Sequence, residues 1–144
     1  MRVVIKRPGS DPEEQEMQST LQAAQRLVDG LIEIPALPGL PRGVDLVCNE
    51  EGLLKGMRPN LAVQGGTLIV GPVVFLSHTR DGEWQGLTDK QVKEVFAYCG
   101  KTSVEARYAR ATVSVVKAVA KDVVAESESK SNKKSNKKNN KEVS

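Results

Sequence analysis

Residues 44–71, VDLVCNEEGLLKGMRPNLAVQGGTLIVG, place the least ordinary polar residues of this chain between two apolar runs. Val44–Cys48 alternates apolar and polar side chains, and Thr67–Leu76 is the most hydrophobic part of the sequence. Enrichment in β-branched residues favours a buried strand over a helix in the second run. Gly71-Pro72 predicts a break or a bulge within it.

The centre of this stretch is rich in turn-forming residues. Asn49-Glu50-Glu51-Gly52 has the chemistry of a tight turn, because Asn can bond its own backbone and Gly can take a positive φ. Leu53–Lys55 is interpreted as a short return strand. Gly56–Gly66 is predicted as a loop, since Pro59 restricts the residue before it and the Gly65-Gly66 pair resists both helix and strand. Loops of this length in a compact domain often carry function.

The segments before this stretch predict two strands and a helix. Ser19-x-x-Gln22 is a capping-box pattern, and apolar residues then recur at helical spacing until Gly30 supplies a left-handed stop. The run after this helix is expected to pair antiparallel with Val44–Cys48 across a proline-rich connection. The expected elements are a strand at Arg2–Arg7, a loop or weak strand at residues 10–18, a helix of about ten residues between Ser19 and Gly30, and a strand at Leu31–Ile34.

Further turn and cap signals follow the stretch. Asp81-Gly82 is a hairpin signal, which predicts a short edge strand containing Trp84. Thr88-x-x-Gln91 is a second capping box, and it starts a helix that is expected to end at Gly100. Thr102-x-x-Glu105 is expected to cap another helix, whose valine stripe depends on packing for its stability.

Together these patterns predict an α+β fold with a small, mostly antiparallel sheet and two or three helices. Residues 1–100 are expected to form the compact domain and residues 101–125 a C-terminal helical extension. Residues 126–144 are predicted to be a disordered tail, because Ser, Asn and Lys alternate there with no apolar residue before Val143.

The net charge of +3 comes from the tail. Residues 126–144 hold six Lys and three Glu, and removing them from the totals of 21 basic and 18 acidic residues leaves 15 of each. A protein that grips duplex DNA through its phosphates usually carries a basic excess on its folded surface. The balanced body therefore argues against nucleic-acid binding, and any weak contact is expected through the tail.

Two cysteines, Cys48 and Cys99, lack Cys-x-x-Cys spacing. This argues against a disulfide framework and against a cysteine-built zinc site. The first residues contain an apolar run too short for a signal peptide. No run approaches the roughly 20 apolar residues that a membrane span needs. A soluble, cytoplasmic protein without membrane contact is therefore expected.

Six short motifs carry a resemblance to a known family: VVIKRP at residues 3–8, GLIEIP at 30–35, LVCNEEGLL at 46–54, RPN at 58–60, GTLIVGP at 66–72 and LTDKQV at 87–92. On these motifs the segment from about Arg2 to Cys99 resembles the bacterial and phage family called domain of unknown function 3846. The resemblance implies a small α+β protein encoded by mobile elements or their hosts. It transfers no catalytic residues, and for a phage-encoded protein it implies the host cytoplasm.

The polar connections supply the candidate binding residues. A glycine loop lets backbone N–H groups approach an anionic or polar ligand, and a guanidinium adds a charged fork. An ordinary turn-rich connection is the alternative interpretation. The candidate ligand-binding residues are Asn49, Glu50, Glu51, Arg58, Asn60, Gly65 and Gly66.

The acidic turn and the single histidine are weak catalytic signals. Glu50 and Glu51 are adjacent and tend to point apart, whereas paired acid/base carboxylates must converge. With Asp45 and Asn49 they offer oxygens to a hard cation, but the Asp-x-Asp-x-Asp-Gly pattern is absent. His78 is the single histidine, and the sequence lacks the Gly-x-Ser-x-Gly motif that would supply a serine nucleophile. No phosphate-loop glycine pattern occurs either. No catalytic residue, metal site or cofactor is predicted.

The leading hypothesis is a non-catalytic binding protein of a phage or mobile element. It would recognise a small polar ligand, such as a nucleotide-type signal of host defence, or a host protein. Two alternatives stay open: a nucleic-acid accessory protein acting through the Lys-rich tail, and a metal-dependent hydrolase built on the acidic turn. The helix after Thr102 also offers a surface for a homo-oligomer.

Overall fold

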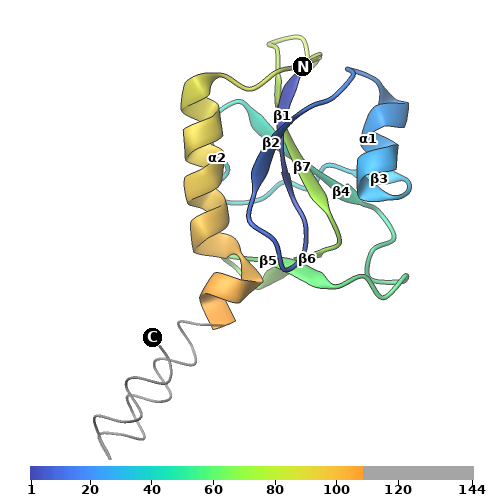
Figure 1. Cartoon of the computed structure of the whole chain (residues 1–144), viewed down its shortest axis with the longest axis vertical. Coiled ribbons are helices and arrows are strands. Elements are labelled where there is room, and N and C mark those ends of the chain that lie inside the picture. Colours follow the sequence, from blue (N-terminus) through green and yellow to red (C-terminus); the bar gives the residue numbers. More distant parts are fainter. Residues whose placement is uncertain (109–144) are drawn as a thin grey trace, which may run out of the picture. The chain divides into compact units, whose positions relative to one another are not determined.

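Antiparallel pairing builds the main sheet in the computed structural model, which describes residues 1–108 (Figure 1). Its strand order is β2-β1-β7-β4-β3, with β8 pairing the end of β7. These strands are β1 (Arg2–Lys6), β2 (Glu13–Glu16), β3 (Ile32–Glu33), β4 (Val44–Asn49), β7 (Val73–His78) and β8 (Trp84–Gln85). The predicted α+β fold with a mostly antiparallel sheet is confirmed.

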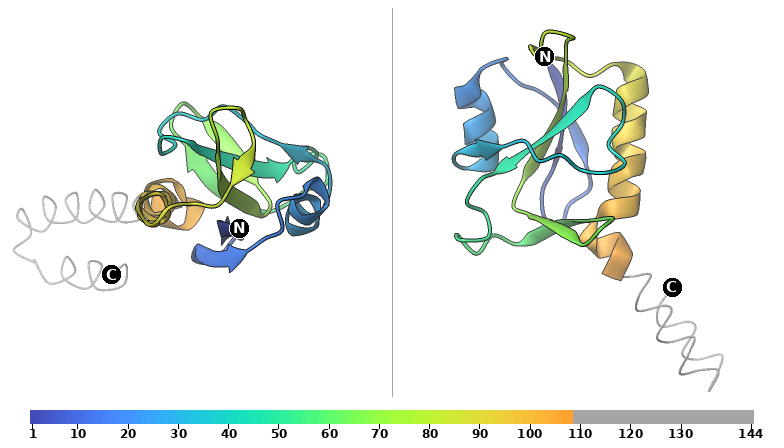
Figure 2. Two further views of the ribbon diagram at one scale, coloured as in Figure 1. Left: turned by 90° about the horizontal axis from the view of Figure 1, so that it is seen from above. Right: turned by 180° about the vertical axis from the view of Figure 1, so that it is seen from behind.

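Two helices cover opposite faces of this sheet, α1 (Leu21–Val28) on one and α2 (Asp89–Thr102) on the other (Figure 2). Side chains of successive strand residues point to opposite faces, so β7 contributes to two cores. Phe75 belongs to the α2-side core, where its ring meets Tyr98 edge-on at 6.1 Å. Val74 and Leu76 belong to the α1-side core.

A separate hairpin of β5 (Pro59–Val63) and β6 (Thr67–Val70) completes the α2-side core with Leu61, Val63 and Ile69. The predicted loop at Gly56–Gly66 is therefore wrong over β5. Pro59 is the first residue of that strand, a position where the missing N–H is tolerated. The predicted return strand at Leu53–Lys55 is also wrong, because residues 50–56 form turns.

Helix α1 begins and ends one residue away from the predicted signals. The Thr20 hydroxyl accepts a hydrogen bond from Ala23 N at 3.2 Å, so Thr20 and not Ser19 is the cap. The left-handed residue at the other end is Asp29, with φ of 62°, while Gly30 has φ of 151°. Either hydroxyl has the chemistry of a cap, and sequence spacing alone does not distinguish them.

Helix α2 begins at the predicted capping box, in which Thr88 and Gln91 each bond the other's backbone N–H. It continues through Gly100, its predicted end, to Thr102, whose hydroxyl donates to Tyr98 O at 2.8 Å. Thr102 is therefore the last residue of α2 and does not cap the next helix. Residues 104–108 are helical again. The rest of the predicted extension, residues 109–125, and the predicted tail at 126–144 lie outside the described residues.

Strand β8 places the single tryptophan beside the end of β7. Trp84 stands opposite His78 in the pairing and packs against the α1-side core.

Within residues 1–108 no helix combines the length and apolar character needed to cross a bilayer.

Candidate functional site

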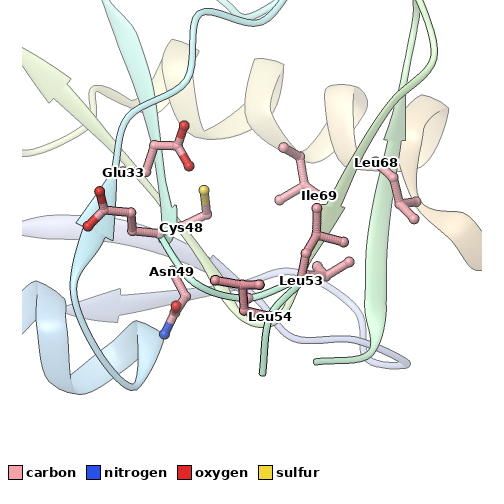
Figure 3. A pocket seen from close by; sticks show the side chains of 10 residues that line it. Glu33, Cys48, Asn49, Leu53, Leu54, Leu68 and Ile69 are labelled. Atoms are coloured by element: carbon pink, nitrogen blue, oxygen red, sulfur yellow. The ribbon is translucent and has the colours of Figure 1, made fainter. Parts of the chain in front are cut away.

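A groove of about 320 Å³ lies between the β3–β4 pair and β6. Figure 3 shows Glu33 and Cys48 on one side of it and Leu68 and Ile69 on the other. We call it the leucine groove. Its lining residues are Glu33, Cys48, Asn49, Glu50, Gly52, Leu53, Leu54, Leu68, Ile69 and Val70.

The Asn49 side chain fixes the turn at residues 50–56. Its amide donates to Val28 O and to Asp29 O, both at 3.0 Å, where helix α1 ends. Its carbonyl oxygen accepts from Glu51 N at 2.7 Å, as the predicted turn chemistry requires. One buried side chain therefore ties the turn to α1 and sets its first bend.

Glycine at position 52 lets the same turn lie against β6. A Cβ added to Gly52 would come within 2.8 Å of Val70 Cγ2. Held in this way, the turn presents its next two residues to solvent, and Leu53 and Leu54 are 74% and 87% exposed. Leu68 of β6, on the facing side, is 45% exposed.

Two aliphatic residues outside the lining of the leucine groove are exposed as well. Leu31 and Ile34, which flank β3, are also exposed. Single exposed apolar residues are normal on protein surfaces, but several that line one groove with polar residues, as Leu53, Leu54 and Leu68 do, mark interaction sites. The arrangement therefore suits contact with an apolar surface of another molecule.

The polar groups at the leucine groove are acidic. Glu33 and Glu50 are both exposed, and none of the lining residues is basic. Burial, together with the smaller effect of the nearby Glu33 carboxylate, raises the pKa of the Cys48 thiol to about 11. The thiol is therefore protonated at neutral pH, which makes it a poor nucleophile.

Asn60, a predicted binding residue, is fully buried and links three segments. Its amide donates to Lys6 O at 2.7 Å and to Gly71 O at 2.9 Å, and its oxygen accepts from Lys6 Nζ at 2.9 Å. All polar atoms of this side chain have partners inside the protein. Lys6 also lies near Cys99, whose pKa burial raises to about 12 while the Lys6 charge acts in the opposite direction.

The remaining predicted residues lie at different places. Arg58 is exposed, with Nη2 close to Gly9, and it precedes β5. Gly65 and Gly66, with φ of 93° and 89°, form the turn after β5. Five strand residues span about 16 Å at roughly 3.3 Å each, so Arg58 and the glycine pair do not converge on one small ligand.

Asn49 and Glu50 line the leucine groove, whereas Glu51 does not.

His78 pairs with Asp45, with Nδ1 and Oδ2 separated by 2.9 Å. Their side chains are 40% and 27% exposed, so the pair does not sit in a deep cleft. The neighbouring Ser77 hydroxyl points to the opposite face of the sheet, where it donates to Gly43 O. Within the described part of the chain, no three His, Cys, Asp or Glu residues gather as a metal site.

Four residues that line the groove were not predicted from the sequence: Glu33, Leu53, Leu54 and Leu68. One signal for the leucine pair was present, because Leu53-Leu54 lies in a turn bounded by Gly52 and Gly56. Leu68 carried no such signal, since it belongs to a continuous apolar run.

A protein-family model described as Domain of unknown function (DUF3846) matches residues 1–100 of the chain. Comparisons with curated proteins and with solved structures found no match.

Proposed function

This chain belongs to the family described as Domain of unknown function (DUF3846), and from the geometry of the leucine groove we propose that it is a non-catalytic binding protein. The observation that carries the proposal is the exposure of Leu53, Leu54 and Leu68 around a groove with two carboxylates at its rim. Exposed leucines of this kind are covered when a partner binds.

The size and lining of the leucine groove favour a protein partner over a small polar ligand. Its volume of about 320 Å³ lies at the lower end of the roughly 300–1,000 Å³ typical of small-molecule sites. Leu53 and Leu54, which line it, are mostly exposed. A central apolar patch with a polar rim is the usual anatomy of a protein interface.

Two further observations support a role in binding without catalysis. The Cys48 thiol in the groove is held in its protonated form by burial. The Asp45–His78 pair is not among the residues that line the groove, and its neighbouring hydroxyl faces the other side of the sheet. The proposed role is therefore to hold a partner.

The family resemblance supports a phage or other mobile element as the source. In that setting, a protein that occupies a host protein would act against host defence. Native mass spectrometry of the protein isolated from its own host tests this part of the proposal. A retained host protein supports it, and a partner encoded by the same mobile element contradicts it.

Site-specific crosslinking tests the groove itself. We expect p-benzoylphenylalanine at position 54 to crosslink one dominant partner in host cells, and Leu53→Asp to abolish the adduct. The same crosslinker at Leu21, which is 49% exposed on α1, serves as the matched control. Identical adducts from positions 54 and 21 would contradict the proposal.

The groove variants are expected to fold normally. Because Leu53 and Leu54 are mostly exposed, replacing both by Asp should change the free energy of unfolding by less than about 0.5 kcal/mol. Urea titration followed by circular dichroism measures this change. A larger loss would mean that the leucines act in folding.

A further inference from the structure

Strand β6 has one paired edge and one open edge. It pairs with β5, and no strand within residues 1–108 pairs with its other side. Gly71 N–H donates to Arg58 O at 2.8 Å, which directs the backbone groups of Gly71 toward the β5 side. Backbone groups of successive strand residues point to alternate sides. The N–H and C=O of Val70 and Leu68 therefore point away from β5.

The two outward-pointing residues differ in their surroundings. At Val70 the turn at residues 50–56 covers the edge, since a Cβ added to Gly52 would lie 3.4 Å from Val70 O. Leu68 lies two residues before Val70, lines the leucine groove and is 45% exposed. Its backbone N–H and C=O therefore face the open part of the groove.

The turn covers the β6 edge at Val70, but the strand itself carries no blunting side chain. Edge strands are commonly blunted by charged residues or proline. Strand β2, at one end of the main sheet, has the sequence EEQE and is exposed throughout. Strand β6 has the sequence TLIV and carries neither a charge nor a proline. The part of this apolar edge that the turn leaves open, at Leu68, is a template for pairing with another chain.

From this edge we infer that the leucine groove receives an extended segment of the partner protein as an added β-strand on β6. The inference rests on the proposed function of the groove and specifies its mode of binding. Main-chain bonds to Leu68 would align the segment. Its aliphatic side chains would cover Leu53, Leu54 and Leu68.

Charge complementarity indicates the other side chains of that segment. Glu33 and Glu50 line the groove together with no basic residue, so a Lys or Arg beside the aliphatic residue would be paired with a carboxylate. The groove has a volume of about 320 Å³. That space suits a few side chains of one strand.

Two labelled peptides test the partner chemistry by fluorescence anisotropy. One alternates Lys and Leu over eight residues, and its matched control alternates Glu and Leu. We expect the full-length protein to bind the Lys-Leu peptide at least tenfold more tightly than the Glu-Leu peptide. Equal binding of the two, or binding of neither, overturns the inference.

Two substitutions at one position separate the main-chain contribution from the side chain. Leu68→Pro removes the outward N–H and leaves the β5 bonds of the neighbouring residues in place. Leu68→Ala removes the side chain and keeps the N–H. We expect Leu68→Pro to weaken peptide binding at least tenfold more than Leu68→Ala. Hydrogen exchange of the unmodified protein supplies a second readout, in which the peptide selectively protects the Leu68 amide.

The outcomes distinguish this inference from the function it rests on. If Leu53→Asp abolishes partner crosslinking but Leu68→Pro binds peptide as Leu68→Ala does, the groove is a binding site and strand addition is wrong. If position 54 shows no specific partner, the proposed function fails first. A dimer of the unmodified protein that Leu68→Pro converts to a monomer would identify a second copy as the occupant and overturn the partner assigned here.

Discussion

Asn60 shows how much structure one side chain can hold. It joins the end of β1, the start of β5 and the β6–β7 turn through hydrogen bonds with Lys6 and Gly71. Because the residue is completely buried, removing the amide leaves these backbone and ammonium groups without those partners. An unsatisfied buried polar group is among the largest single-residue penalties in folding.

We therefore expect Asn60→Leu to reduce the free energy of unfolding by about 2–4 kcal/mol. Urea unfolding followed by far-ultraviolet circular dichroism measures the change. Gln64→Leu, at an exposed position in the β5–β6 hairpin, is the matched control and should change it by less than about 0.5 kcal/mol. A loss below about 1 kcal/mol for Asn60→Leu would contradict this account.

Residue-scale prediction from the sequence succeeded where the partner is local. The turn chemistry of Asn49 predicted a bond to the following backbone, and Glu51 N supplies it. The same side chain also binds Val28 O and Asp29 O, about twenty positions earlier in the chain. Nothing in the local sequence encodes that contact, which depends on where α1 packs. Asn60 was predicted to bind a ligand because the local sequence does not show that Lys6 and Gly71 are its partners in the fold.

Helix α1 offers a test at the scale of elements. Thr20 accepts the hydrogen bond of Ala23 N, whereas adjacent Ser19 is exposed and outside the helix. We expect Thr20→Ala to lower the free energy of unfolding by about 1 kcal/mol and Ser19→Ala to change it by less than about 0.3 kcal/mol. Thermal and urea unfolding of both variants measure the difference. Equal losses would mean that the two hydroxyls share the cap.

Element prediction was most accurate where the signal is short-range. The capping box at Thr88, the pairing of residues 31–34 with 44–48 and the short strand at Trp84 are confirmed. Strand β5 was missed because Pro59 and two following glycines resemble a loop. Burial of Leu61 and Val63 against the α2-side core overrides that local signal.

Because of the two buried thiols, the free energy of unfolding of the molecule is expected to fall as pH rises in the alkaline range. Their pKa values are raised, to about 11 for Cys48 and about 12 for Cys99, above the ordinary value of 9.0. The unfolded chain therefore loses these protons first as pH rises. The stability that the protonated thiols contribute is complete below pH 9 and is lost progressively as pH rises toward 12.

Between pH 8.5 and 11 we expect this linkage to remove about 2 kcal/mol or more from the free energy of unfolding. The double variant Cys48→Ala with Cys99→Ala should lose correspondingly less over the same interval, since other titrating groups are common to both proteins. Urea titrations at fixed pH values give the two slopes. Parallel slopes would show that the thiols do not control this dependence.

At the scale of the whole molecule, the fold class was predictable and the leucine groove was not. Composition and periodicity predicted the α+β fold, and its antiparallel sheet is confirmed. The groove arises only because the β5–β6 hairpin returns close to the β3–β4 pair. Such an approach between separate sheets has no periodic signature in a single sequence.

The position of Trp84 provides the chain with an intrinsic optical probe. It is the only tryptophan, and it packs on the α1-side core, while the leucine groove is lined by other residues. Indole emission should therefore shift when the sheet opens and stay constant when the groove is filled. A titration that quenches this emission without unfolding would point to an event at β8, so one unlabelled sample separates docking from denaturation.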